Sequence, residues 1–149
     1  MFFYLAHHGD ALGPEVDPQR PLSARGRGQA DALAAQAAAR GVRPAAIWHS
    51  GKLRARQTAE AYWGACNPLA EFTATRWAQP GDPPRLADLL EVETRDVMLV
   101  GHMPHLDRLL RRLLGEDEGL SPFPLNGLVS VERVDEAWVE RWRLAAPQA

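Results

Sequence analysis

Short apolar runs alternate along this chain with longer segments of helical periodicity. The runs at residues 2–6, 45–49 and 96–100 are typical of buried strands, and residues 71–74 are a weaker candidate. The last part of the chain alternates in apolar and polar residues on either side of Asp135-Glu136. That pattern predicts a hairpin of two strands, at residues 128–134 and 137–144.

Capping residues and helix breakers mark the helices between these strands. Ser23 can cap a helix that ends at Arg40-Gly41, and Ser50 can open a second helix that ends near Gly64. A short helix is expected after Pro83-Pro84, and a longer one at residues 106–114. Strands that alternate with helices indicate a three-layer αβα sandwich, whose mostly parallel sheet carries an antiparallel edge hairpin.

Composition limits the classes of function. The 149 residues predict a single domain, 1–149, and the net charge of −2 points neither to nucleic acid nor to a membrane surface as partner. No apolar stretch approaches the ~20 residues of a membrane span. Cys66 is the only cysteine, so an internal disulfide is impossible, and a buried structural thiol is expected. We therefore expect a soluble, cytoplasmic protein.

Histidines collect at one place in the predicted fold. The five histidines are His7, His8, His49, His102 and His105, and each lies at or just beyond the end of a predicted strand. Ligands of open α/β sheets bind in the crevice outside the carboxyl ends of the strands. At least two of these histidines are thus expected to share a site.

A candidate anion site follows the second predicted strand. The segment HSGKLRARQTA places Ser50 at a helix start and Arg54 on the first turn. Free backbone N–H groups at a helix start and a nearby guanidinium both favour a phosphate group.

Four motifs, in order, resemble those of the histidine phosphatase superfamily, whose fold is phosphoglycerate mutase-like. They are LAHHGDA, DPQRPLSARGRGQA, HSGKLRARQTAE and DVMLVGHMPHL, and they span most of the chain. The resemblance is greatest to the short bacterial branch that removes phosphate from protein phosphohistidine, because the chain has no room for the long insertions of the mutases.

The resemblance implies a mechanism and residue roles. His8 would be the nucleophile and become a phosphohistidine that water hydrolyses, and His102 would donate to a phosphoryl oxygen. The other phosphate-binding residues would be His7, Gly9, Arg20, Ser50 and Arg54. Neither a metal nor another cofactor is implied.

Two positions depart from the family pattern. Gly51 replaces a proline, which loosens the helix start but is expected to leave its N–H groups available. His7 replaces an arginine, and neutral imidazole offers one donor where arginine offers a charged fork. Two hypotheses would restore the charge: protonation of His7 beside a phosphate dianion, or a contribution from Arg20. The alternative role for Arg20 is an ion pair with Asp17.

The general acid is open among Asp10, Glu71 and Asp82. A phosphohistidine can lose a neutral imidazole, so it needs less help from an acid than a phosphate ester does. This favours a phosphorylated protein, such as a phosphotransfer domain, as substrate. The alternatives are a small phosphorylated substrate, hydrolysed as by a phosphomonoesterase, and a catalytically impaired homologue that binds phosphate or a phosphoprotein.

The same residues allow other interpretations. A metal site could use His7, His8, His102 and His105, but the spacing implies no further ligand. His105 is expected to be a surface residue at a helix start. His49 either forms a hydrogen bond behind the site or merely ends its strand, and the loop that carries Trp77 could overhang the pocket.

Overall fold

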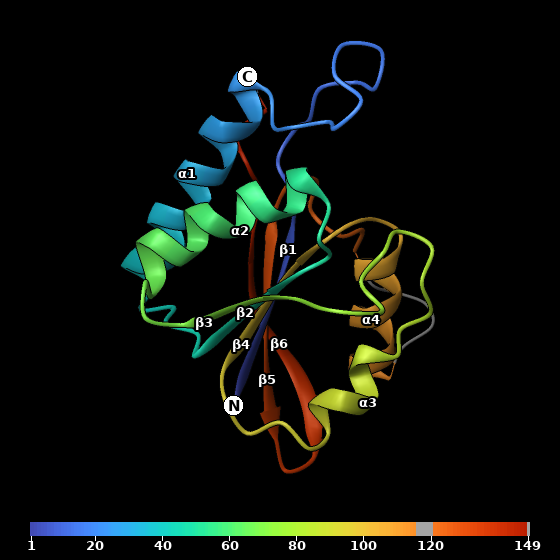
Figure 1. Cartoon of the computed structure of the whole chain (residues 1–149). Helices are drawn as coiled ribbons and strands as arrows, with labels where there is room; N and C mark the ends of the chain where they lie inside the picture. The colour runs from blue at the N-terminus through green and yellow to red at the C-terminus, as the bar shows by residue number, and fades with distance from the viewer. Residues whose placement is uncertain (116–120, 149) are drawn as a thin grey trace.

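The computed structural model describes residues 1–115 and 121–148, and its central element is a six-stranded sheet (Figure 1). The strand order is β3-β2-β4-β1-β5-β6. Their bounds are β1 Phe2–His7, β2 Ala46–His49, β3 Glu71–Ala74, β4 Val97–Gly101, β5 Leu128–Val134 and β6 Ala137–Leu144. The first four strands of this order are parallel, and β5 and β6 form an antiparallel hairpin at one edge. The predicted fold class is confirmed.

Helices cover both faces of the sheet. The described helices are α1 Ala24–Ala39, α2 Leu53–Cys66, α3 Leu86–Leu90 and α4 His105–Leu114. Figure 1 shows α1 and α2 on one face and α3 and α4 on the other. Side chains of β1 alternate between the two layers, since Phe3 and Leu5 pack with α3 and α4, whereas Tyr4 and Ala6 pack toward α1 and α2.

Local signals explain several element boundaries. The Ser23 side chain accepts a hydrogen bond from the Gly26 N–H, so it caps α1 as the sequence predicts. Asp135 and Glu136 both have positive φ, as a two-residue turn between antiparallel strands requires. Gly115 ends α4 in the left-handed conformation. None of the helices in the described ranges is long and apolar enough to span a membrane.

The register of the parallel strands brings the carboxyl ends of β1, β2 and β4 to the same edge of the sheet. His7, the last residue of β1, pairs with Gly101 at the end of β4. His49 ends β2 beside Val100. The loops that follow these strands therefore leave the sheet at a common carboxyl edge, where His8 and His102 continue the chain.

Candidate active site

Three histidine rings meet at the carboxyl edge of the sheet. The ring centroids of His7 and His8 are 4.6 Å apart, and those of His8 and His102 are 5.0 Å apart. Burial, together with the positive charge of Arg54, lowers the pKa of His7 and His102 to about 3 and that of His8 to about 4. The three rings are therefore neutral at pH 7 and share the field of one arginine.

The His8 ring is held in one tautomer. Its Nδ1 lies 2.7 Å from the Gly9 carbonyl oxygen, which can only accept, so the proton is on Nδ1. Nε2 then carries a free lone pair. Burial, aided by the Arg54 and Arg20 charges, lowers the pKa of His8 to about 4, although the hydrogen bond to the Gly9 carbonyl and the charge of Asp10 act in the opposite direction. A neutral imidazole with a free nitrogen has the form that a nucleophile needs.

His7 is tied to a segment far along the chain. Its Nδ1 accepts a 2.8 Å hydrogen bond from the Asn126 backbone N–H, and the Asn126 side-chain amide donates to the His8 carbonyl oxygen at 2.7 Å. Desolvation, reinforced by His8 and Arg54, lowers the pKa of His7 to about 3. His7 is therefore neutral in the free protein, with Nδ1 as an acceptor. The hypothesis that it gains a proton beside a bound phosphate dianion stays a prediction.

Ser50 has a different role from the predicted one. Helix α2 begins at Leu53 behind Lys52, which makes no side-chain cap, so the expectation that Ser50 caps this helix is wrong. The Ser50 hydroxyl lies 2.6 Å from His102 Nε2 and accepts a 3.3 Å bond from the Lys52 N–H. The contact fixes the orientation of the His102 ring, and either Ser50 Oγ or His102 Nε2 can supply its proton. If His102 donates to a phosphoryl oxygen through Nε2, the bond to Ser50 must first be exchanged.

Gly51 and His49 form a single unit behind the site. Gly51 has φ +92°, a value that proline cannot adopt. Its N–H donates to His49 Nδ1 at 3.0 Å. This N–H is therefore occupied by a bond that a proline could not make. The expectation that the N–H groups of the helix start stay available is not contradicted and stays a prediction. Of the two roles open for His49, the structure supports the hydrogen bond.

Two arginines supply positive charge to the site. Arg54 lies on the first turn of α2, and its Nε is buried without a partner among the described residues. Burial and the charge of Arg20 lower the pKa of Arg54. Arg20 Nε donates to the Leu12 carbonyl, and no ion pair links Arg20 to Asp17 within the described chain. Arg20 is thus close enough to act on both Arg54 and His8, as the charge hypothesis needs.

The glycine that follows His8 is required by packing. A Cβ on Gly9 would lie 2.6 Å from the Gly26 carbonyl oxygen of α1. Gly9 is expected from the resemblance to bind phosphate, and the structure shows in addition that α1 occupies the space that a side chain would need. The Gly9 N–H also donates to Thr58 Oγ1 at 3.0 Å and is therefore occupied in the free protein.

Sequence reasoning missed the residues that hold the two site loops. Gln29 Oε1 accepts from the Asp10 N–H, and Gln57 Oε1 accepts from the Leu22 N–H. Thr58 Oγ1 bridges the Gly9 N–H and the Arg54 carbonyl. These three side chains belong to the motifs already quoted, so the available signal was polar residues on helix faces that were otherwise apolar.

The three acid candidates lie in different places. Asp10 acts on the pKa of His8, and its carboxylate accepts a 2.7 Å bond from Ser23 Oγ. Asp82 accepts from the Gln79 N–H within the segment that precedes α3. Glu71 begins β3 at the opposite end of the sheet and pairs with Arg95, so it cannot be the acid. Of the three, Asp10 is the one whose charge acts on the pKa of His8.

His105 is placed differently from its expected position at the surface. It is fully buried at the start of α4, and neither ring nitrogen has a partner in the described part of the chain. The histidines do not complete a metal site there, because no three described His, Cys, Asp or Glu side chains are grouped to hold an ion. Cys66 is buried, as expected.

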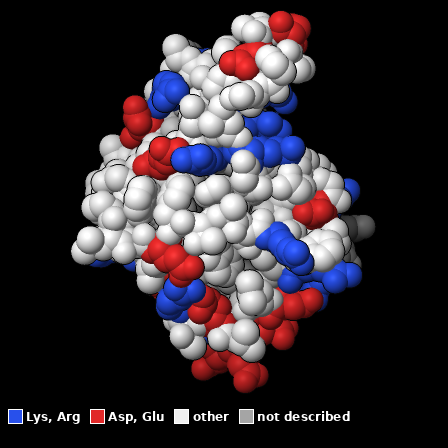
Figure 2. All heavy atoms as spheres, viewed as in Figure 1, with Lys and Arg blue, Asp and Glu red and all other residues white. Residues whose placement is uncertain are grey.

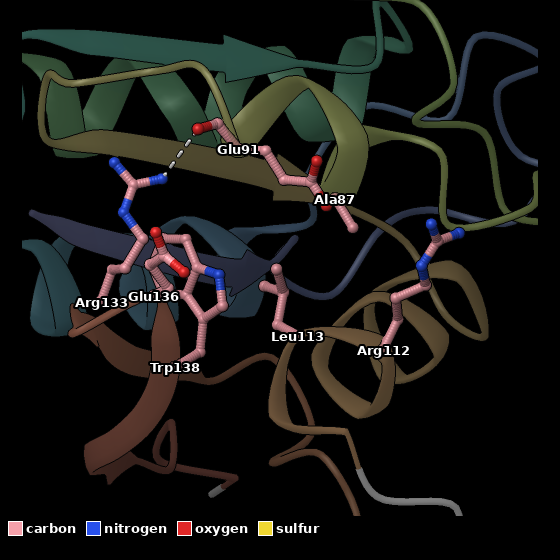
Figure 3. A pocket seen from close by; sticks show the side chains of 7 residues that line it. All are labelled: Ala87, Glu91, Arg112, Leu113, Arg133, Glu136 and Trp138. Atoms are coloured by element: carbon pink, nitrogen blue, oxygen red, sulfur yellow. Dashed lines mark hydrogen bonds between the residues drawn. The ribbon is translucent and has the colours of Figure 1, made fainter.

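A cavity of about 660 Å³ lies away from the histidines, near the hairpin turn (Figure 3). Its lining consists of Ala87, Glu91, Arg112, Leu113, Arg133, Glu136 and Trp138. Arg112 pairs with Asp88, and Arg133 donates to backbone carbonyls at the end of α3. Because both cations are engaged within the fold, this cavity lacks the free positive charge of the histidine site.

Comparison with known proteins gives both a family and structural relatives. The model of the histidine phosphatase superfamily (branch 1) matches residues 4–76. The protein histidine phosphatase SixA complexed with tungstate is similar at a TM-score of 0.85 and 24% identity, with 97% of each chain covered. A candidate phosphohistidine phosphatase SixA from Agrobacterium tumefaciens is similar at 0.80 and 29% identity, also with 97% of each chain covered.

A more distant relative shares the fold. A phosphoserine phosphatase mutant from Entamoeba histolytica, in complex with phosphoserine, matches at a TM-score of 0.71 and 14% identity, with 95% of each chain covered. No curated protein sequence gives a match.

The class of protein follows from the fold and its histidine-lined edge: this is a phosphoglycerate mutase-like α/β protein of the phosphatase type. The histidine phosphatase superfamily is the family that residues 4–76 match, and the similar SixA structures cover 97% of the chain. The resemblance seen in the four sequence motifs is thereby confirmed.

Proposed function

We propose that this protein is a protein-phosphohistidine phosphatase that acts through a covalent phosphohistidine on His8. The observation that carries the proposal is the state of the His8 ring. Its Nδ1 proton is fixed by the Gly9 carbonyl, so Nε2 is unprotonated beside the charges of Arg54 and Arg20. This combines a nucleophile with a binding site for a phosphoryl group.

The proposed reaction has two transfers. His8 Nε2 attacks phosphorus in line, its lone pair forms the new N–P bond, and the bond to the leaving group breaks with its electron pair. Water then attacks the phosphoryl group on His8, releases inorganic phosphate and restores the imidazole. Arg54 stabilises the phosphoryl oxygens in both steps, and no step requires a metal.

The positions of the acidic side chains favour a substrate with an N–P bond. Asp10 is engaged with Ser23, and Glu71 lies at the other end of the sheet. A substrate imidazole whose other nitrogen carries a proton leaves as a neutral molecule, whereas an alkoxide needs a proton from the enzyme. A phosphohistidine on a phosphotransfer domain is therefore the proposed substrate, and a small phosphate ester would be hydrolysed more slowly.

The state of His7 favours a second candidate, a homologue that binds the phosphorylated partner with little turnover. A neutral His7 whose Nδ1 accepts from Asn126 has one remaining donor. Loss of a charge-assisted hydrogen bond costs about 1.5–3 kcal/mol, or roughly tenfold to a hundredfold in rate if the bond forms in the transition state. The two candidates differ in turnover and agree in phosphate affinity.

The test is phosphate release from a phosphotransfer domain phosphorylated on histidine. Wild type, His8→Ala and His7→Arg are compared, with tungstate affinity as the measure of an intact site. Release by wild type and none by His8→Ala is expected. Release by His7→Arg alone would show that the protein is a homologue that binds its phosphorylated partner with little turnover. Equal release by wild type and His8→Ala would show that His8 is not the nucleophile.

A further inference from the structure

The segment between β3 and α3 is fastened to the active-site loop. Ala78 is fully buried in the core, and Gln79 Nε2 donates to the Ser50 carbonyl at 2.8 Å. The Gln79 N–H and Asp82 form a second bond that closes the segment on itself. Because Ser50 also contacts His102, this segment forms part of the rim of the site.

The same segment between β3 and α3 carries an exposed aromatic residue. Trp77 is 41% exposed, whereas Trp48 on β2 is 7% exposed. Trp77 has φ +63°, an unfavourable conformation for a bulky residue, which persists because its neighbour Ala78 is anchored in the core. The Arg85 guanidinium lies 4.4 Å from the centre of the Trp77 ring. The segment thus presents a rigid, stacked Trp–Arg pair to solvent.

The surroundings of this pair are positively charged. Lys52, Arg54, Arg76 and Arg85 have no carboxylate within ion-pair distance in the described parts of the chain. Figure 2 shows basic side chains over the start of α2 and over the segment before α3, with uncharged atoms and some acidic atoms between them. A phosphoryl group needs one or two cations, so the cations at the outer rim are available for a larger anionic surface.

We propose that Trp77 and Arg85 are docking residues for the protein that carries the phosphohistidine, and that this partner presents an acidic surface. The inference rests on the proposed function. Tryptophan and arginine are the residues that most often dominate binding energy at interfaces, and unpaired rim cations speed association with an acidic partner. A small phosphorylated molecule bound at His8 needs neither side chain.

The experiment compares two substrates with the same N–P bond. Phosphoimidazole reports on the chemistry, and a phosphotransfer domain phosphorylated on histidine reports on docking. For Trp77→Ala and Arg85→Glu, KM for the phosphoprotein is expected to rise about tenfold or more. The kcat/KM for phosphoimidazole should stay at the wild-type value. The effect of Arg85→Glu should shrink in high salt, because the attraction is screened.

Matched variants separate docking from folding. Arg40 stacks on Trp142 at 4.7 Å, at the end of α1 that leads into β2, so Arg40→Glu should leave both substrates unaffected. Trp77→Phe keeps an aromatic ring and should stay near wild type. Equal losses on both substrates, or no loss on either, would overturn the inference. Failure of wild type to hydrolyse phosphoimidazole would instead overturn the proposed function.

Discussion

The two ends of the sheet use arginine in opposite ways. At the carboxyl end, Arg54 and Arg85 have no carboxylate partner in the described chain, and the nearby rings of His7, His8 and His102 are neutral. Around the other end, Arg95 and Arg112 are paired with acids and Arg133 is engaged with backbone carbonyls. Figure 2 shows acidic side chains gathered over that lower end. Cations without internal partners are the ones left to bind an anion.

The largest effect is expected when a free cation is compared with a paired one. Arg54→Gln should lower kcat for phosphate release about a thousandfold, the low end of the range for an arginine that stabilises a transferring phosphoryl group. Arg112→Gln removes a guanidinium that pairs with Asp88 and should leave kcat unchanged. Steady-state kinetics of the two variants measure both effects. A similar loss of kcat in both variants would show that the unpaired and the paired arginine do not differ in function.

Acid should destabilise the histidine end. Folding holds the pKa of His7 and His102 at about 3 and that of His8 at about 4, against about 6.5 in the unfolded chain. The unfolded chain therefore binds more protons between pH 6.5 and 4, and the free energy of unfolding falls as pH falls through that window. Urea unfolding across this range measures the slope. His8→Asn should flatten it, and an unaltered slope would contradict the assignment.

The same shift predicts the pH dependence of activity. Because His8 stays neutral well below pH 6.5, kcat/KM should remain near its pH 7 value down to about pH 5, provided the protein is folded. A nucleophile with an ordinary histidine pKa would lose activity in proportion to its protonation over the same range. A fall that begins near pH 6.5 would show that the ring is not desolvated as described.

At the other end, the expected effect is on stability alone. Arg133 donates to the Leu90 carbonyl at 2.6 Å and to the Glu93 carbonyl at 2.7 Å, which fastens the end of α3 to the hairpin. Arg133→Met keeps the apolar stem and removes these bonds, with an expected loss of about 1.5–3 kcal/mol in the free energy of unfolding. Urea titration measures the loss, and phosphate release should not change. A change in turnover would mean that the two ends are coupled.

The smallest effect is expected for an exposed ion pair. Arg95 pairs with Glu71 and Glu93, but its side chain is 43% exposed, so solvent screens both contacts. Arg95→Gln should change the free energy of unfolding by less than about 1 kcal/mol. Thermal unfolding at low and high salt measures it, and a loss comparable with that of Arg133→Met would show that this network supports the fold.

The hydrophobic pattern was sufficient for the order of the elements, because burial repeats locally with a period of two in strands and near four in helices. The strands at residues 2–7 and 97–101 and the hairpin were predicted to within a residue or so. The start of α2 was not, because Ser50 has the chemistry of a cap while the Gly51 backbone turns away from the helix. The same polar residue types occur as helix caps and in functional sites, so residue type alone does not distinguish the two roles.

By itself, the sequence determined the sheet, its two helical layers and the gathering of histidines at the carboxyl edge. The four motifs also indicated the family whose model matches residues 4–76. Only the tertiary structure decided which charged and titratable side chains lie close enough to affect one another electrostatically. It buried His105, placed Glu71 at the wrong end to serve as an acid, and fixed the uncharged state of His7 through Asn126, a partner 119 residues away. A proton's position depends on neighbours in space, and those neighbours come from segments that no local pattern connects.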